Sequence, residues 1–194
     1  MIKREKYLSQ IRDFYDKDLI KVITGIRRSG KSILLKQIME ELKEKGIKDN
    51  HIIYVNFEDV KYANINDFMK LNDYIIPMIG DEEKYYLFFD EIQVVNGWEK
   101  VINSFKATLN VSIFVTGSNS KLLSGELATL LSGRYVSFLV MPFTFSEVVK
   151  LKDLKGKEEI RMAFLDYILW GGMPQRFEFD NENSMRAYLT DIFN

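Results

Sequence analysis

One stretch restricts the fold of this chain more than any other: residues 22–32 read VITGIRRSGKS. The stretch matches the pattern G-x-x-x-x-G-K-[ST] at every fixed position. Residues 21–24 predict a short buried strand before the loop, and apolar residues at helical spacing over 33–42 predict a helix after it. A strand, a glycine-containing loop and a helix in this order are the context that the pattern requires, so an α/β fold is expected.

The residue types of this loop are those that a phosphate group needs. Gly25 and Gly30 permit positive φ and a close approach of the backbone, so that successive N–H groups point into one cradle at a helix N-terminus. Lys31 is expected between the β- and γ-phosphates of a nucleotide, and the hydroxyl of Ser32 is expected to reach Mg²⁺. The predicted nucleotide-binding residues are Gly25, Ile26, Arg27, Arg28, Ser29, Gly30, Lys31, Ser32 and Ile33.

A second informative stretch, residues 84–91, reads KYYLFFDE. Its continuous apolar run predicts a central parallel strand, and open α/β sheets bind ligands at the carboxyl ends of such strands. If this strand neighbours the strand before the loop, Asp90 and Glu91 lie beside the phosphates. Asp90 is then expected to support Mg²⁺ through its water shell, and Glu91 to orient and polarise the attacking water. The alternative is an ordinary acidic loop after a strand.

Polar residues also follow another buried strand, which is predicted over 111–115. They read TGSN over 116–119. Asn119 or Ser118 is expected either to contact the γ-phosphate or to form a plain Asx or Ser turn. With this position included, the predicted catalytic residues are Glu91, Lys31, Arg134 and Asn119, and the predicted metal ligands are Ser32 and Asp90.

The rest of the chain alternates between helices and strands. The lone His51 opens a strand predicted over 51–57 and is expected at the surface, since no second histidine exists to share a metal. We expect a phosphate-binding domain over 1–152 and a helical segment over 153–194, the truncated start of a C-terminal region. Helices are predicted at 3–16, 65–79, 98–109, 120–131, 144–150, 160–170 and 183–194, and a further strand at 135–141.

Composition limits the partners. A net charge of −1 and a pI near 6.0 give no overall electrostatic case for nucleic acid or an anionic membrane surface. Nucleic acid is therefore an unsupported partner, and no membrane association is expected. The sequence has no cysteine, which excludes a disulfide framework and a thiolate metal site and fits a reducing cytosol. The first residues lead into no apolar segment typical of a signal peptide, so a cytoplasmic location is expected.

Other classes of nucleotide-binding protein fit the residues less well. A GTPase is expected to carry Asn-Lys-x-Asp for guanine, which the sequence lacks. Residues 123–126 and 131–134 weakly suggest the serine–glycine signature of ABC ATPases, but here they follow the strand acids instead of preceding them. A small-molecule kinase seldom has Asp-Glu at the end of a central strand. It usually carries an arginine-rich lid, of which residues 120–160 show little.

Together these motifs resemble those of the AAA+ branch of P-loop ATPases. More narrowly, they are similar to an uncharacterised prokaryotic AAA family known simply as "ATPase, AAA superfamily". The resemblance covers roughly residues 20–176 and rests on TGIRRSGKS, FDEIQ, TGSN, LSGR, PFTFSE and GGMP in this order. It implies a three-layer P-loop sandwich with a five-stranded parallel sheet, the loop strand near its centre and a short helical appendage after it. It also implies ATP with Mg²⁺, a candidate arginine finger at Arg134, and a C-terminal domain or protein partner that this chain lacks.

Two main hypotheses for the function follow. The first is an enzyme in which Mg²⁺-dependent ATP hydrolysis drives conformational work in a larger machine. The second is a nucleotide-gated binding or scaffold module with slow or no turnover, and a DNA-associated motor is a weaker third. Arg134 is expected to point outward and to reach the γ-phosphate of a neighbouring subunit in a homo-oligomer. Its alternative is a surface ion pair with Glu126 or Glu147.

Overall fold

The computed structural model describes residues 2–117 and 131–193. Contacts between residues divide the chain into two units. The larger unit holds residues 5–25 and 31–140, and the smaller holds 2–4, 26–30 and 141–193. The predicted division between residues 152 and 153 stays a prediction. None of the described helices combines the length and the apolar composition that crossing a bilayer requires.

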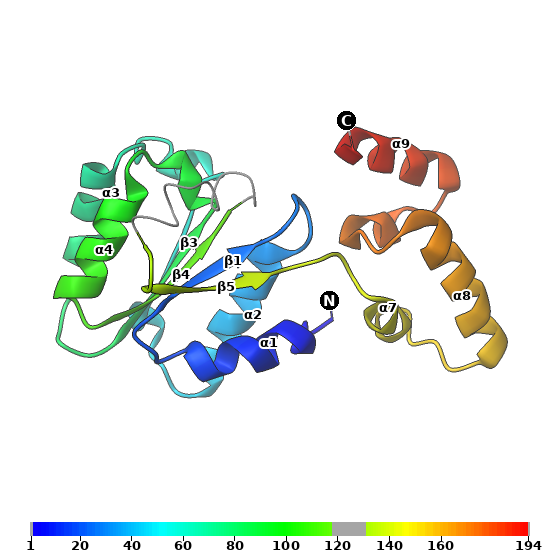
Figure 1. Ribbon diagram of the computed structural model, residues 1–194, viewed down its shortest axis with the longest axis horizontal. Coiled ribbons are helices and arrows are strands. Elements are labelled where there is room, and N and C mark those ends of the chain that lie inside the picture. The colour runs from blue at the N-terminus through cyan, green and yellow to red at the C-terminus, as the bar shows by residue number, and fades with distance from the viewer. Residues whose placement is uncertain (1, 118–130, 194) are drawn as a thin grey trace. The chain divides into compact units, whose positions relative to one another are not determined.

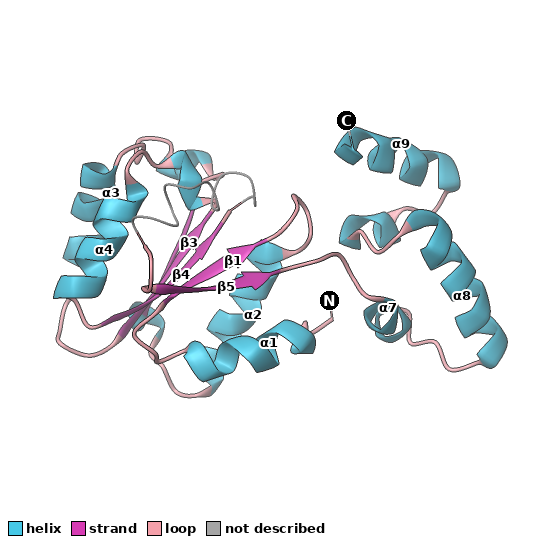
Figure 2. Cartoon of the chain, viewed as in Figure 1, coloured by secondary structure: helices cyan, strands magenta, loops and turns pink. Residues whose placement is uncertain are grey.

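A five-stranded parallel sheet forms the centre of the larger unit, as predicted (Figure 1). The spatial order is β2-β3-β4-β1-β5, and every pairing is parallel. Figure 2 shows the strand arrows running in the same direction, so the strands end at one common edge. The strands are β1 (Ile20–Thr24), β2 (Ile52–Asn56), β3 (Tyr85–Asp90), β4 (Val111–Thr116) and β5 (Tyr135–Leu139).

Helices cover both faces of this sheet and make a three-layer sandwich (Figure 1). Residues of α1 (Glu5–Ile11) and α2 (Lys31–Glu44) pack in the core on one face. Residues of α3 (Phe68–Ile75) and α4 (Trp98–Thr108) pack in the core on the other. The strands β1 and β3 are buried at every position, which explains the apolar run of β3.

The helix α2 is anchored by a fully buried apolar stripe of Leu34, Leu35 and Ile38. Each such side chain stabilises the fold by roughly 1.5–3 kcal/mol relative to an exposed position. The stripe repeats at the spacing of a helix that faces a sheet, as the sequence predicts. Because α2 begins at Lys31, this packing also fixes where the loop after β1 ends.

Short 3-10 turns account for most differences from the predicted boundaries. The helix expected over 65–79 begins at Phe68, since Asp67 accepts from the backbone N–H groups of Met69 and Lys70 at 3.0 Å each and caps it. The helix expected over 3–16 divides into α1 and a 3-10 turn. These turns are η1 (Arg12–Phe14), η2 (Asp49–His51), η3 (Val60–Tyr62), η4 (Ile76–Met78) and η5 (Ile92–Val94).

The surface position predicted for His51 is wrong. The residue closes η2 directly before β2 and is only 3% exposed. Its ring lies 4.4 Å from the ring of Tyr85, the first residue of β3. Since β2 and β3 are neighbouring parallel strands, the residues at their amino ends cover each other.

The smaller unit is helical, with a core of Met173, Met185 and Leu189. Its α7 begins with a capping box, in which Thr144 accepts from the N–H of Glu147 and Glu147 accepts from the N–H of Thr144. A Cβ atom on Gly172 would collide with the carbonyl of Phe143, which explains the glycine there. The elements are α7 (Phe145–Leu151), α8 (Lys157–Trp170), η6 (Pro174–Glu178) and α9 (Glu182–Phe193).

Candidate functional site

The loop between β1 and α2 has the backbone that its glycines predict. Gly25 has φ 150° and Gly30 has φ 98°, and both values lie where L side chains are strained. Arg28 also has positive φ, 64°, although it carries a side chain. Ser29 is fully buried, and its hydroxyl has no hydrogen-bond partner among the described residues. A residue other than glycine with positive φ, such as Arg28, costs about 1–3 kcal/mol, and such residues cluster at ligand-binding positions.

Lys31 is the first residue of α2 and is 5% exposed. Its Nζ donates to the carbonyl of Gly25 at 3.3 Å and lies 3.6 Å from Oε1 of Glu91. Ser32 is half-buried in the first turn of the same helix, and Ile33 follows it. The N-terminus of a helix carries a partial positive charge, so this turn favours an anion next to the lysine.

Asp90 ends β3 and is fully buried. The hydroxyl of Tyr54 donates to its Oδ2 at 2.8 Å, and the hydroxyl of Thr116 donates to its Oδ1. Burial, and then the charge of Asp90, raise the pKa of Tyr54, which keeps the phenol protonated as a donor. A carboxylate has about four acceptor positions, so Asp90 keeps capacity for a further donor such as metal-bound water.

Glu91 follows directly and has a left-handed backbone with φ 56° and ψ 46°. Its N–H donates to Oγ1 of Thr116 at 3.0 Å, and its Oε2 accepts from Nε2 of Gln93 at 2.5 Å. Within the described chain, the buried Oε1 of Gln93 has no hydrogen-bond partner. The left-handed turn and these two contacts hold the Glu91 carboxylate within reach of Lys31.

The strand of the acid pair is not a direct neighbour of the loop strand. Asp90 and Glu91 were expected beside the phosphates if β3 neighboured β1, but β4 lies between the two strands. Two strand spacings amount to about 10 Å. The long side chains of Lys31 and Glu91 span this gap from their opposite sides, so the predicted meeting of lysine and acid still occurs.

Three polar residues of this edge escaped the sequence analysis. Thr116 ends β4 in the TGSN stretch, for which roles were predicted at Ser118 and Asn119 only. Tyr54 lies inside β2, where an aromatic residue is ordinary and no motif marks it. Gln93 belongs to the FDEIQ motif without a role suggested by its type. Ser118 and Asn119 lie outside the described residues.

Arg134 lies at the opposite edge of the sheet from the acid pair. Its carbonyl accepts from the N–H of Ile20 at 2.9 Å, so the residue sits beside the start of β1, whereas the loop follows the end of β1. The side chain is exposed, as predicted, and its Nη1 donates to Oδ1 of Asn103 at 3.2 Å. Of the two ion-pair partners considered, Glu147 pairs with Arg4, and Glu126 lies outside the described residues.

Arg4 contacts the loop from within the smaller unit and was not predicted. It is 2% exposed, its Nε lies 2.6 Å from Oε1 of Glu147, and its Nη1 donates to the carbonyl of Ser29 at 3.1 Å. The guanidinium also lies 4.9 Å from the ring centre of Phe143. A buried arginine held on several sides fixes the backbone it contacts, here the loop carbonyl of Ser29.

A second loop residue has a partner in the same unit. The guanidinium of Arg28 lies 5.4 Å from the ring centre of Tyr188 in α9, within the range of a cation–π contact. Burial raises the pKa of Tyr188, and Arg28 opposes that shift. Both Arg27 and Arg28 are exposed. The contact with Tyr188 places Arg28, which residue type alone could not assign.

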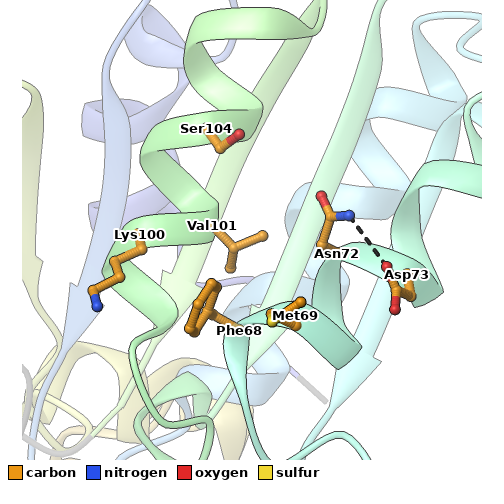
Figure 3. A pocket seen from close by; sticks show the side chains of 7 residues that line it. All are labelled: Phe68, Met69, Asn72, Asp73, Lys100, Val101 and Ser104. Carbon is orange, nitrogen blue, oxygen red and sulfur yellow. Dashed lines mark hydrogen bonds between the residues drawn. The ribbon is translucent and has the colours of Figure 1, made fainter.

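A pocket of about 220 Å³ lies between α3 and α4 (Figure 3). Phe68 of α3 lies beside Val101 of α4, and Lys100 extends at the margin. The pocket contains neither Lys31 nor the acid pair. The candidate site is therefore the carboxyl edge of the sheet, where the loop, Lys31, Asp90 and Glu91 come from the ends of β1 and β3 and the start of α2.

Comparison with known proteins agrees with this geometry. The solved structure of a Walker-type ATPase of Pyrococcus abyssi covers 99% of this chain and 72% of its own, with a TM-score of 0.66 and 16% identity. AMPPCP-bound DnaA of Aquifex aeolicus covers 97% of this chain and 59% of its own, with a TM-score of 0.53 and 16% identity. At such identities the likeness shows the fold, which is that of P-loop ATPases.

Sequence comparison gives the family. An uncharacterised protein of Haemophilus influenzae is 44% identical over 195 residues, which are 100% of this chain and 48% of that protein. The chain spans about half the length of the curated relatives it matches. A family model described as an AAA domain matches residues 17–149, more than half of the chain. The chain therefore belongs to this AAA-domain family of P-loop nucleoside triphosphatases.

Proposed function

We propose that the chain binds ATP with Mg²⁺ and hydrolyses it. The observation that carries the proposal is the meeting of Lys31 Nζ and Glu91 Oε1 at 3.6 Å, at the carboxyl edge of a parallel sheet. One is the cation that a triphosphate needs and the other is a base for water. The AMPPCP-bound state of the similarly folded DnaA supports an adenine nucleotide as the ligand.

The residues present fit a magnesium nucleotide. Ser32 offers a hydroxyl in the first turn of α2, and Asp90 keeps acceptor capacity beyond the two hydroxyls that it binds. Ser29, further back in the loop, has a buried hydroxyl without a protein partner, which a phosphate oxygen would satisfy. When bound, Mg²⁺ supplies charge neutralisation between the phosphate oxygens.

Glu91 is the proposed general base. In the described state its carboxylate is held by Gln93 at 2.5 Å and faces Lys31, so both must release it, or share it, before it takes a proton from water. A phosphate that draws Lys31 away removes the contact with Lys31 and leaves the one with Gln93. The base then contributes typically ~10²–10⁴-fold to the rate.

The same two contacts favour a second candidate function. If Gln93 keeps Glu91 occupied, the chain acts as an ATP-gated binding module with slow turnover. In either case the conformational work and any oligomer belong to the proposal, because the chain spans about half the length of its relatives. A DNA-associated role is tested by fluorescence anisotropy over a salt series, where phosphate contacts give a steep slope.

Steady-state phosphate release separates the two candidates. It is measured with ATP and with GTP, each with and without Mg²⁺, for the wild type, Glu91→Gln and the control Glu44→Gln. Glu44 is an exposed acid at the end of α2. An enzyme shows Mg²⁺-dependent turnover that falls ~10²–10⁴-fold in Glu91→Gln, with ATP affinity retained and the control unchanged. Tight ATP binding with equal, negligible turnover in all three proteins would establish the gated module instead.

A further inference from the structure

A cluster of three metal-ligating side chains lies at the amino edge of the sheet, opposite the proposed nucleotide site. His51 closes η2 directly before β2, while Asp81 and Glu83 belong to the turn before β3. The starts of these paired parallel strands bring the three side chains together. One nitrogen of His51 and one carboxylate oxygen of each acid all lie within 4.8 Å of one another.

The histidine is an unusual member of such a cluster because it is buried. It is 3% exposed, and its Nε2 has no hydrogen-bond partner in the part of the chain that the structure describes. Oδ2 of Asp81 lies 3.3 Å from this nitrogen. A buried polar atom left without a partner costs about 1–3 kcal/mol. A ligand bound by both Nε2 of His51 and Oδ2 of Asp81 would remove this cost.

Neighbouring groups fix the orientation of the ring and of one acid. The ring of Tyr85 lies 4.4 Å from the imidazole, and the Tyr85 hydroxyl accepts from the N–H of Gly80 at 3.0 Å. Oδ1 of Asp81 accepts from the N–H of Glu83 at 2.9 Å, which leaves Oδ2 facing the histidine. Metal ligands are typically held in this way by surrounding contacts.

Glu83 completes the cluster from the other side of the ring. Its Oε2 lies 3.4 Å from Nδ1 of His51 and 3.0 Å from Nζ of Lys48. The carboxylates of Glu83 and Asp81 are 58% and 46% exposed, so both can turn toward an ion while His51 stays fixed. Lys48 is 61% exposed and can leave into solvent, because an exposed ion pair holds it only weakly.

We propose that His51, Asp81 and Glu83 bind a divalent transition-metal ion of the Zn²⁺ type. An imidazole with two carboxylates suits borderline ions such as Zn²⁺ and Co²⁺, whose bonds to nitrogen and oxygen are about 2.0–2.2 Å long. Three protein ligands leave a coordination position for water. The ion joins the start of β2 to the turn before β3, and it is distinct from the Mg²⁺ of the proposed nucleotide site.

The test is a titration of the chelator-treated, nucleotide-free chain with Co²⁺ and Zn²⁺, followed by calorimetry and by the visible absorption of Co²⁺. We expect one ion of this type per chain, with a midpoint of thermal unfolding that rises on Zn²⁺ addition but not on Mg²⁺ addition. His51→Gln is expected to weaken binding by about tenfold or more. Glu82→Gln, which changes an exposed acid of the same turn, serves as the matched control.

A second variant covers the case in which His51→Gln does not fold. The double variant Asp81→Asn/Glu83→Gln keeps the buried ring and changes only exposed side chains, and it is also expected to lose the Co²⁺ absorption. The proposal is overturned if the wild type shows no Co²⁺ absorption and no rise in its unfolding midpoint. It is equally overturned if the double variant binds Co²⁺ as the wild type does, because the carboxylates of Asp81 and Glu83 would then not be metal ligands. Their contacts with His51 would be ion pairs only.

Discussion

The two edges of the parallel sheet hold buried polar groups in opposite ways. At the carboxyl edge, Asp90 is fully buried but receives hydrogen bonds from Tyr54 and Thr116. At the amino edge, Lys21 of β1 is equally buried, and its Nζ donates to Oγ of Ser112 at 2.7 Å and to the carbonyl of Lys17 at 3.1 Å. Burial lowers the pKa of Lys21 to about 7.

This difference separates function from stability. The carboxyl edge supplies donors to a carboxylate and keeps a strained residue, Glu91, in position for a ligand. At the start of β1, Lys21 lies in the core with its charged form disfavoured, apart from the metal site proposed at the starts of β2 and β3. Variants at the carboxyl edge should therefore change nucleotide binding and turnover, whereas a variant at Lys21 should change the stability of the fold. The predictions below are ordered by the size of the expected effect.

Arg134 is the residue that can break this separation, since it lies at the amino edge but is proposed to act on a neighbouring subunit. Arg134→Ala is expected to lose ~10³–10⁵ in turnover while ATP affinity stays constant. Specific activity of the wild type should then rise with protein concentration. Mixing Arg134→Ala with Lys31→Ala should restore some activity at mixed interfaces. Turnover that does not depend on concentration, without recovery on mixing, would leave Arg134 as a surface residue bonded to Asn103.

Lys31→Ala tests the carboxyl edge directly. The variant removes the cation proposed to bind the phosphates, and hydrogen bonds to charged groups contribute about 1.5–3 kcal/mol. ATP affinity measured by calorimetry should therefore fall about 10- to 100-fold. Lys36→Ala, an exposed lysine of the same helix, is the matched control and should bind as the wild type does. Equal affinity in both variants would contradict the phosphate site.

Thr116→Val sharpens the role of the carboxyl edge. The change conserves shape but leaves one oxygen of Asp90 and the N–H of Glu91 without the hydroxyl that each contacts. We expect kcat to fall about tenfold with little change in KM. The variant disturbs the orientation of the proposed base, Glu91, but leaves the phosphate-binding loop unchanged. Stability should fall by about 1–3 kcal/mol. A loss of stability with unchanged kcat would make Thr116 purely structural.

Lys21→Met tests the amino edge. The pKa of Lys21 is about 7 in the fold, below its ordinary value of 10.5. Between these two values the unfolded chain binds a proton that the folded chain does not. Stability of the wild type should therefore rise with pH across that window, by at most about 1.4 kcal/mol per pH unit. Urea unfolding at pH 7.5 and pH 9 should show this rise in the wild type and its loss in the variant, with turnover unchanged.

The pattern of residues explains why the sequence predicted one part of this site and missed another. The loop, Lys31, Asp90 and Glu91 are found because each belongs to a short motif whose spacing is visible in the chain. The five-stranded parallel sheet, which the family resemblance implied, is confirmed, and the apolar run of β3 marks its central strand in the sequence. Short motifs and apolar stretches involve residues that are close together in the chain, and a single sequence is enough to detect them.

The missed residues act through partners that lie far away in the chain. Arg4 pairs with Glu147, 143 positions further along, and Tyr54 donates to Asp90, 36 positions further along. His51 was expected at the surface because nothing next to it shows that Tyr85 will cover it. Only the folded chain brings these pairs together, so residue type alone could not assign their roles.

The hydrogen bonds around Asp90 have a direction. A hydroxyl carries a single proton, and both Tyr54 and Thr116 point theirs at the same carboxylate. Thr116 is thereby left with lone pairs alone for its other neighbour, which suits the N–H of Glu91 and would suit no acceptor. Residues of three neighbouring strands thus donate hydrogen bonds in one direction, toward Asp90. Loss of the Thr116 hydroxyl removes a donor to Asp90 and an acceptor for Glu91 together, so the acid pair keeps or loses its arrangement as a unit.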